Sequence, residues 1–311
     1  MTRLDERQVI RILARKLGIA DLDDVSRVGK NLVLKSDMLV SSTDVPPQMK
    51  PWQIARKSVV SCASDLAAKG AKPIASMISL GIPRDADGKF INGLADGFAR
   101  ASKEFGVQIV GGDTNEASEL VIDCCMLGVV SGAMPSRTGA RPGDVVVVSG
   151  LFGLPSAGLA LLLKGAHATS SFSKRATKSV LEPVPRQKYG AALARYFTSS
   201  IDSSDGLAIS LYELAKGSGV DMDIDNIPAA PGVQRFASDN GLDSRDLIFH
   251  GGEEYEIVAT IPRSKFRQAE LAAKSAGVEL HAIGSAIRGS GNVRVEKRRL
   301  QDRGYTHFSR R

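Results

Sequence analysis

Cysteine is scarce in this sequence of 311 residues, which contains only Cys62, Cys124 and Cys125. Adjacent cysteines such as Cys124 and Cys125 bridge to each other only with strained geometry, so no disulfide framework is expected. A reducing compartment, the cytoplasm, is the simplest expectation. Residues 1–18 alternate charged and apolar side chains and lack the apolar core of a signal peptide. They predict an amphipathic helix that ends at Gly18.

Uninterrupted apolar segments are scarce as well. Residues 145–163 carry no charge over 19 positions, which reaches the minimum length of a membrane span. The segment nevertheless begins with the β-branched run 145–148 and continues through three glycines and Pro155. This pattern predicts a buried strand, a turn and a helix, so we expect no association with a membrane.

The chain also lacks a strongly basic region outside its C-terminal tail. The 41 Lys and Arg against 34 Asp and Glu give a net charge of +7. Residues 288–311 hold eight basic and two acidic side chains, so this tail carries +6 and the rest of the chain about +1. A basic stripe of the kind that binds nucleic acid is therefore absent, and we expect no nucleic-acid partner.

The usual nucleotide and metal signatures are not found. The sequence contains no Gly-x-x-x-x-Gly-Lys-Ser/Thr loop and no Gly-x-Gly-x-x-Gly between a strand and a helix. Its four histidines, at 167, 250, 281 and 307, do not have zinc-ligand spacing. P-loop, dinucleotide-fold and zinc-site interpretations are therefore excluded.

What is present indicates a mixed chain with enough apolar residues, 43%, for two cores. A Ser, Gly, Pro and Arg-rich segment at 131–143 predicts a domain boundary. Helical spacing and terminating glycines predict helices, and β-branched runs predict strands. The expected helices span 52–69, 90–105, 157–164, 186–197, 207–216 and 265–276, and the expected strands 33–34, 38–40, 74–80, 107–110, 120–130, 145–148, 255–261 and 278–283. The fold class is α/β or α+β.

Aspartates recur in short segments of small residues, where Asp and Ser also cap helices and close turns. Asp65 is the hardest to explain in that way, because it lies on the apolar side of the expected helix 52–69 and an ionised carboxylate there needs a partner. Carboxylates brought together repel unless cations neutralise them, and hard oxygen ligands favour Mg²⁺ together with phosphates. Nearby glycines let backbone amides approach phosphate oxygens. We therefore predict a metal-bridged phosphate site. The segments are Asp23-Asp24, 35–37, 41–44, 64–66, 112–114 and 202–206.

Several longer motifs resemble the thiamine-monophosphate kinase family of the aminoimidazole ribonucleotide synthetase-like ATP-binding superfamily. Their order and spacing match over essentially the whole chain. One departure is Leu22-Asp23-Asp24, where the family usually has Gly-Asp-Asp; leucine lacks the freedom of glycine at positive φ, which makes Asp24 the least secure ligand. The motifs are Ser64–Pro73, Gly111-Gly112-Asp113-Thr114, Ser136–Asp144, Ile201–Leu207, Gly251–Glu256 and Gly304-Tyr305-Thr306-His307-Phe308.

The resemblance implies the roles of individual residues. The implied Mg²⁺ ligands are Asp24, Ser36, Asp37, Asp65, Asp113, Asp202 and Asp205. The implied ATP-binding residues are Gly112, Asp113, Arg137 and Ser204, and the implied contacts to thiamine phosphate are Asp44, Glu253 and Tyr305. A tyrosine ring suits a flat heterocycle, and an acidic side chain balances the thiazolium charge or accepts from the aminopyrimidine.

The resemblance also implies the activity and the assembly. ATP and thiamine phosphate would react by in-line attack of the substrate phosphate, with several Mg²⁺ ions and no covalent intermediate or general base. An N-terminal domain, 1–138, would bind ATP and Mg²⁺ and form a homodimer through its sheet, and 139–311 would form a second α/β domain. Two alternatives stay open: another ATP-dependent enzyme of the superfamily, and an inactive kinase that binds RNA through its basic tail.

Overall fold

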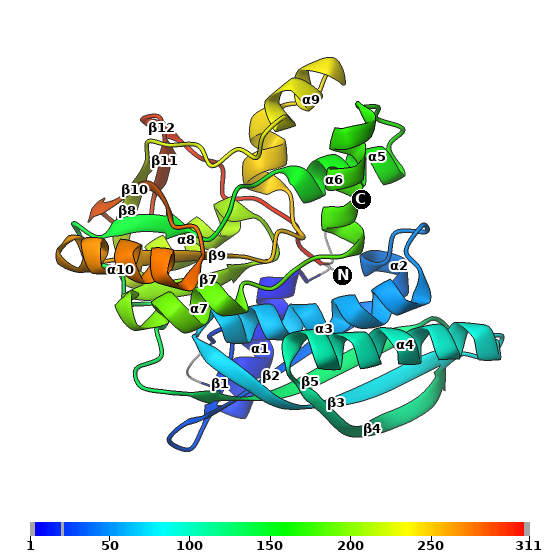
Figure 1. The fold of residues 1–311 in the computed structure, drawn as a ribbon. Coiled ribbons are helices and arrows are strands. Elements are labelled where there is room, and N and C mark those ends of the chain that lie inside the picture. Colours follow the sequence, from blue (N-terminus) through cyan, green and yellow to red (C-terminus); the bar gives the residue numbers. More distant parts are fainter. Residues whose placement is uncertain (1–3, 20–21, 308–311) are drawn as a thin grey trace.

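The structure is a computed structural model that describes residues 4–19 and 22–307. Two β-sheets with helices packed on them make up the molecule (Figure 1). This arrangement confirms the expected α/β class. Phe308, the last residue of the C-terminal motif, lies outside the described residues.

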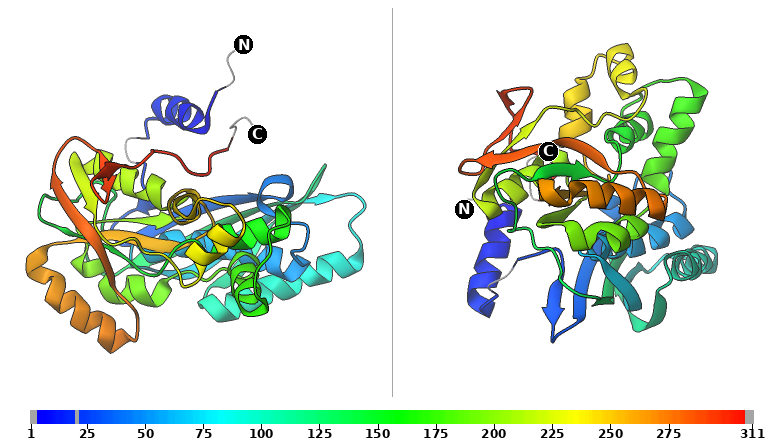
Figure 2. Two further views of the ribbon diagram at one scale, coloured as in Figure 1. Left: turned by 90° about the horizontal axis from the view of Figure 1, so that it is seen from above. Right: turned by 60° about the vertical axis from the view of Figure 1, so that its left-hand side comes forward.

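The first sheet has the strand order β1-β2-β5-β3-β4. Helices α3 (Pro51–Ala68) and α4 (Gly88–Phe105) cover one of its faces and leave the other face open (Figures 1 and 2). β4 is paired with β3 only and forms the edge of the sheet. The strands are β1 (Ser26–Val28), β2 (Leu32–Val40), β3 (Ala71–Pro83), β4 (Gln108–Ala117) and β5 (Val121–Val130).

The second sheet has the order β12-β11-β8-β10-β6-β9-β7. Its strands are β6 (Val145–Val148), β7 (Ser199–Ser203), β8 (Val220–Ile224), β9 (Glu256–Ile261), β10 (His281–Arg288), β11 (Val293–Val295) and β12 (Arg298–Arg299). The helical elements of this half are α5 (Leu154–Leu163), α6 (Ser170–Leu181), α7 (Gln187–Leu193), η1 (Ala194–Tyr196), α8 (Leu207–Ser218), α9 (Val233–Asp239), η2 (Asp246–His250) and α10 (Arg263–Ala276).

Helix α3 joins the two halves. It packs on β2, β3 and β5 of the first sheet and also contacts α7, β7 and β9 of the second half. Small side chains permit this close approach: a Cβ on Gly190 of α7 would lie 1.9 Å from the carbonyl oxygen of Ala67. Because α3 is buried on nearly all sides, any charged residue on it must find its partner inside the protein.

Most expected elements are present, and the strands β2, β3 and β4 are longer than expected. The helices expected at 52–69 and 90–105 are α3 and α4, and the strand expected at 145–148 is β6. The interpretation of 35–37 and 111–114 as turns is wrong, because both segments lie inside the long strands β2 and β4. A strand turns alternate side chains to opposite faces, so polar residues within it still reach a site.

The N-terminal helix, α1 (Glu6–Leu17), ends as expected at Gly18, which has a left-handed φ of 68°. Asp5 caps its other end. The helix lies beside the second half of the chain: Arg7 is 3.2 Å from Glu213 of α8, and the His307 amide donates to Glu6 over 3.0 Å. The first helix in the sequence therefore packs next to the last described residues (Figure 2).

Residues 145–163 form strand β6 and helix α5, as their glycines and Pro155 predict. Among the described residues, no helix has the length and apolar character that crossing a bilayer requires.

Candidate functional site

A cavity of about 660 Å³ lies where the two halves of the chain meet. It receives residues from β2, from α2 (Ser41–Asp44), from the loops beside β7 and β9, and from the C-terminal segment. Seven of the residues predicted from the sequence line it: Asp37, Asp44, Asp202, Ser204, Asp205, Glu253 and Tyr305. The fold thus brings together side chains that lie up to 268 positions apart in the sequence.

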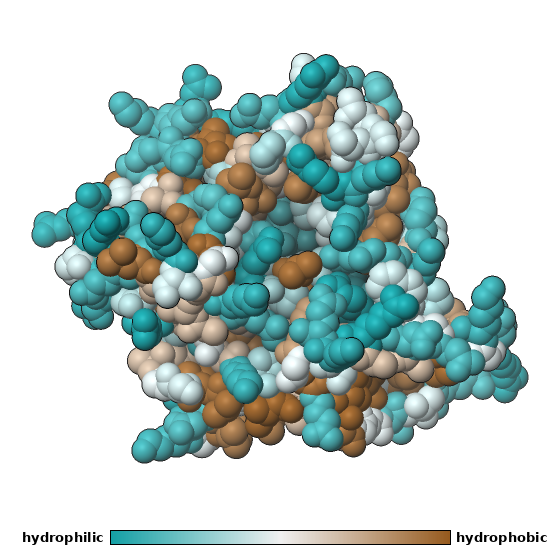
Figure 3. All heavy atoms as spheres, viewed as in Figure 1, coloured by the Kyte–Doolittle hydropathy of each residue, from teal (hydrophilic) through white to brown (hydrophobic). Residues whose placement is uncertain are grey.

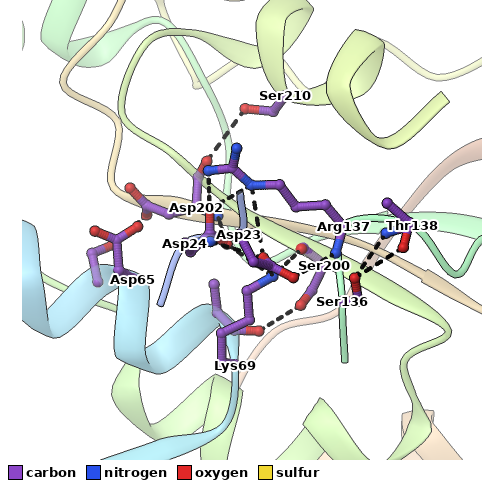
Figure 4. Close-up of polar contacts among 12 residues, drawn as sticks. Asp23, Asp24, Asp65, Lys69, Ser136, Arg137, Thr138, Ser200, Asp202 and Ser210 are labelled. Carbon is purple, nitrogen blue, oxygen red and sulfur yellow. Dashed lines mark hydrogen bonds and ion pairs between the residues drawn. The ribbon is translucent and has the colours of Figure 1, made fainter. Parts of the chain in front are cut away.

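Behind this cavity, two cationic side chains converge on a pair of aspartates (Figure 4). Lys69 is completely buried, and its Nζ lies 2.6 Å from Asp23 Oδ1 and 3.0 Å from Asp24 Oδ2. Arg137 Nε donates to Asp24 Oδ1 over 2.9 Å, and its Nη2 also contacts that oxygen. Lys69 further donates to the Ser200 carbonyl. Residues from four distant segments are thereby tied together.

The cations set the protonation of Asp24. Burial alone would raise the pKa of this carboxyl, but Lys69 and Arg137 lower it below its ordinary value. Asp24 is therefore an ionised carboxylate whose oxygens are already bonded to the protein. Asp202 also approaches it, since its amide lies 3.4 Å from Asp24 Oδ2.

Asp65 and Asp202 differ from Asp24, because for them burial outweighs the nearby positive charge and raises the pKa. Burial, together with the neighbouring Asp24 and Asp37, raises the pKa of Asp65 to about 7 in spite of Lys35. Burial and the neighbouring Asp65 raise the pKa of Asp202 well above its ordinary value, although the Ser64 hydroxyl donates to it. Asp202 forms no ion pair among the described residues and would gain from an added cation, whereas Asp65 already has Lys35 as its one cationic partner there.

Glu253 is held in a special conformation on the cavity wall. Its φ is 70°, in the left-handed region that side chains rarely adopt. Lys57 Nζ lies 2.7 Å from Glu253 Oε1, and the Tyr255 hydroxyl donates to Oε2 over 3.3 Å. Lys57 also donates to the Asp44 carbonyl over 2.7 Å. One buried lysine therefore connects two of the predicted substrate contacts.

Ser36, Gly112 and Asp113 do not line the cavity. Ser36 donates to Asp123 Oδ1 over 2.6 Å, on the face of the sheet opposite to Asp37. Asp113 lies in the edge strand β4, where its register through Ser79 places it in the same row as Asp123. Ser36 and Asp113 are therefore on the open face, separated by the sheet from the remaining carboxylates, whereas Gly112 pairs with the buried Ile78 and faces the helices.

The oxygen atoms at the cavity suit a Mg²⁺ site in which the protein supplies only some of the ligands. Asp37, Asp202 and Asp205 present carboxylate oxygens to the cavity, with Ser204 beside them. Within residues 4–19 and 22–307, no three His, Cys, Asp or Glu side chains form a ready-made metal cage. Mg²⁺ usually binds through one or two carboxylates and substrate phosphates and retains waters, so the carboxylates suit an ion that arrives with a phosphate ligand.

The sequence interpretation missed four residues of this region: Asp23, Lys35, Lys57 and Lys69. A signal for the last two was present on helix α3. Lys57, Ser61, Asp65 and Lys69 follow one another at intervals of four residues, which forms a single polar stripe on an otherwise apolar helix. The stripe faces the cavity and the aspartate pair.

The fold and site define the class of protein. Residues 20–130 match the family model of the AIR synthase related protein, N-terminal domain. Hydrogenase maturation protein HypE, 20% identical with a TM-score of 0.69, shares the fold over 91% of this chain and 92% of its own. Residues 20–130 are thus similar to an AIR synthase-related N-terminal domain, and the chain as a whole shares the fold of HypE.

More specific relatives cover nearly the whole chain. The thiamine-monophosphate kinase of Nitrosopumilus maritimus (strain SCM1) is 40% identical over 99% of this chain and 100% of its own length. That of Pyrococcus horikoshii is 39% identical, over 85% and 84% of the two chains. A solved structure described as AaThiL complexed with AMPPCP and TMP superposes with a TM-score of 0.90, at 26% identity and 99% coverage of both chains. The chain belongs to the thiamine-monophosphate kinase family.

Proposed function

We propose that this protein is an enzyme that uses ATP to phosphorylate thiamine monophosphate to thiamine diphosphate. The cavity between the two halves carries the proposal, because it combines carboxylates suited to metal-bound phosphates with acidic and aromatic side chains suited to a cationic heterocycle. Family membership supports the same activity. The solved complex with AMPPCP and TMP is of a relative that shares the fold over nearly its full length.

The residues of the chain act by binding and positioning. Asp44, Glu253 and Tyr305 hold thiamine monophosphate, and Arg137 and Ser204 hold ATP together with Gly112 and Asp113. Asp37, Asp202 and Asp205 hold Mg²⁺, which supplies charge neutralisation between the phosphates. The attacking phosphate oxygen is anionic at neutral pH, so the site needs no general base. Catalysis then rests on alignment and electrostatic stabilisation, as is usual in phosphoryl transfer.

Incubation with ATP, Mg²⁺ and thiamine monophosphate tests the activity directly. We expect thiamine diphosphate and ADP in equal amounts, measured by chromatography, and no product when Mg²⁺ is chelated. ADP without thiamine diphosphate, or a product only from a different phosphorylated acceptor, would favour another enzyme of the same superfamily.

Removal of the Tyr305 ring should weaken substrate binding selectively. The side chain lines the cavity, is 40% exposed and packs edge-on against His307 with ring centroids 5.1 Å apart. Stacking is worth on the order of 1 kcal/mol, so Tyr305→Ala should raise the KM for thiamine monophosphate about tenfold or somewhat less. The kcat should be nearly unchanged, because stacking on the heterocycle is made in ground and transition states alike. The KM for ATP should also be nearly unchanged, because Tyr305 is assigned to the other substrate. An unchanged KM for thiamine monophosphate would mean that Tyr305 only packs the C-terminal segment.

Loss of the Lys57 cation should have a related effect. Lys57→Met leaves Glu253 without its ion-pair partner and frees the Asp44 carbonyl. We expect the KM for thiamine monophosphate to rise by roughly one order of magnitude, with a decrease in Tm of several degrees. Steady-state kinetics with each substrate varied separately measure the effect. Lys274→Met, on the exposed side of α10 and away from both the cavity and the open sheet face, is the matched control and should leave both KM values unchanged.

We also propose that the open face of the first sheet binds a second copy of the chain. Apolar side chains gather there, at the lower edge of the view in Figure 3. Met38, Met77 and Val110 are 60%, 52% and 57% exposed, and Leu34 and Ile74 are 38% and 39% exposed. Pairing two such faces covers this patch and the edge of β4. Asp113, one of the residues assigned to ATP, lies at that face, so ATP binding is completed in the dimer.

The remaining proposals concern the division of the chain, its location and its basic tail. The chain divides near residue 138, between the last strand of the first sheet and the first strand of the second, and it acts in the cytoplasm.

The tail does not act as an RNA-binding segment. Arg294 lies 3.1 Å from Asp221, and Arg303 pairs with Asp246, so part of its charge is neutralised within the second half. Affinity for thiamine monophosphate well above affinity for RNA at physiological salt is the expected result.

A further inference from the structure

A lysine ammonium lies between a carboxylate that lines the cavity, Asp37, and one that does not, Asp65. Lys35 Nζ is 2.7 Å from Asp65 Oδ2 and 3.8 Å from Asp37 Oδ2. The two aspartates belong to different elements, α3 and β2, so a single cation links helix and sheet. The Asp65 side chain is only 9% exposed and that of Lys35 23%, which keeps solvent screening of the pair weak.

The other two cations of this region are committed elsewhere. Lys69 pairs with Asp23 and Asp24, and Arg137 pairs with the same two residues. Among the described residues, Lys35 is the only cationic side chain within ion-pair distance of Asp65. A buried carboxylate without a counter-charge is strongly destabilising, so this one contact largely satisfies Asp65.

We propose that the Lys35 ammonium takes the place of one divalent cation in this site. It bridges Asp65 and Asp37 permanently, so Asp65 positions Lys35 and does not bind Mg²⁺. Metal binding is confined to the cavity-facing oxygens of Asp37, Asp202 and Asp205. The inference deepens the proposed function, because it states which carboxylates remain for metal-bound ATP.

Charge and geometry both support this division. Mg²⁺ requires near-octahedral oxygen ligands at about 2.0–2.1 Å and keeps part of its water shell. An ammonium that already touches Asp65 occupies that volume and repels a second cation at close range. A lysine is also tethered to the strand, so its charge is present at any Mg²⁺ concentration. We extend the proposal to Asp24, whose oxygens bond to Lys69 and Arg137 and which was expected from the sequence to bind Mg²⁺.

Counting bound Mn²⁺, a spectroscopically visible substitute for Mg²⁺, tests the inference without relying on activity. Purified full-length protein is titrated with Mn²⁺, with and without AMPPCP, and free Mn²⁺ is measured by electron paramagnetic resonance. Lys35→Ser should bind one more Mn²⁺ per chain than the wild type. The matched control is Lys30→Ser, an exposed lysine of the same hairpin, which should bind the wild-type number. Equal counts for Lys35→Ser and the wild type overturn the proposal.

Asp65→Asn provides a second, independent test of the proposal, in case Lys35→Ser does not fold. If Lys35 replaces a metal ion, Asp65→Asn should keep the wild-type Mn²⁺ count; loss of one Mn²⁺ per chain overturns the proposal. Circular dichroism verifies that each variant is folded. Synthesis of thiamine diphosphate by the wild type is measured on the same preparation, so a failure of the proposed function is recognised separately from the metal count.

Discussion

Asp202→Asn should reduce kcat by roughly two to three orders of magnitude while leaving the protein at least as stable as the wild type. Asp202 is 8% exposed, lines the cavity, and has a pKa raised well above its ordinary value by burial and by Asp65. Its negative charge is therefore unfavourable in the folded protein without a bound cation. Asparagine still accepts the Ser64 hydrogen bond but removes the charge that the reaction requires.

The pH dependence of stability distinguishes this cause from a simple packing effect. A carboxyl whose pKa is raised on folding binds more protons in the folded than in the unfolded state, so stability falls as pH rises above the ordinary value. In the absence of Mg²⁺, the Tm of the wild type should decrease between about pH 5 and pH 8 more than that of Asp202→Asn. Asp225→Asn, an exposed carboxylate after β8, is the control for both readouts. Near-normal turnover in folded Asp202→Asn would remove Asp202 from the metal site.

A charge at the centre of the open sheet face should dissociate the dimer. Met77 is 52% exposed and lies opposite Cys125 in the β3–β5 register. In a two-fold symmetric interface both copies carry the substitution, so Met77→Arg places two uncompensated cations on the apolar contact. We expect the dissociation constant of the dimer to rise at least about a hundredfold and the enzyme to be monomeric at micromolar concentration. Turnover should fall with it, because Asp113 lies on this face.

Light scattering measures the mass of the protein in solution and hence its oligomeric state. The rate of alkylation of Cys125 measures how exposed the open face of the first sheet is. Cys62 and Cys124 are buried, so thiol labelling of the folded protein reports mainly Cys125. Labelling should be slow in the wild type and fast in Met77→Arg. Leu271→Arg, on α10 and 55% exposed, is the control and should remain dimeric. A wild type that is monomeric and fully active contradicts the dimer proposal.

Local patterns in the sequence were sufficient for the elements and for most of the site. The apolar spacing of 52–69 predicted α3, and the β-branched run 145–148 predicted β6, because each signal depends on neighbours within a few residues. The motifs that resemble the kinase family supplied Asp44, Glu253 and Tyr305, which all line one cavity. These conclusions needed no knowledge of how the segments are arranged in space.

Only the tertiary structure decided which side of the first sheet each polar residue faces and which charges meet. Ser36 and Asp37 are adjacent in sequence, yet strand alternation directs them to opposite faces. The pairing of Lys69 with Asp24 joins segments 45 residues apart, and that of Arg137 with Asp24 joins segments 113 residues apart. Ion pairs of this kind leave no periodic signal, because their partners are selected by the packing of α3 between two sheets. The sequence by itself therefore determined the elements and the carboxylates, and the packing determined which carboxylates are neutralised by lysine and arginine and which remain for a metal.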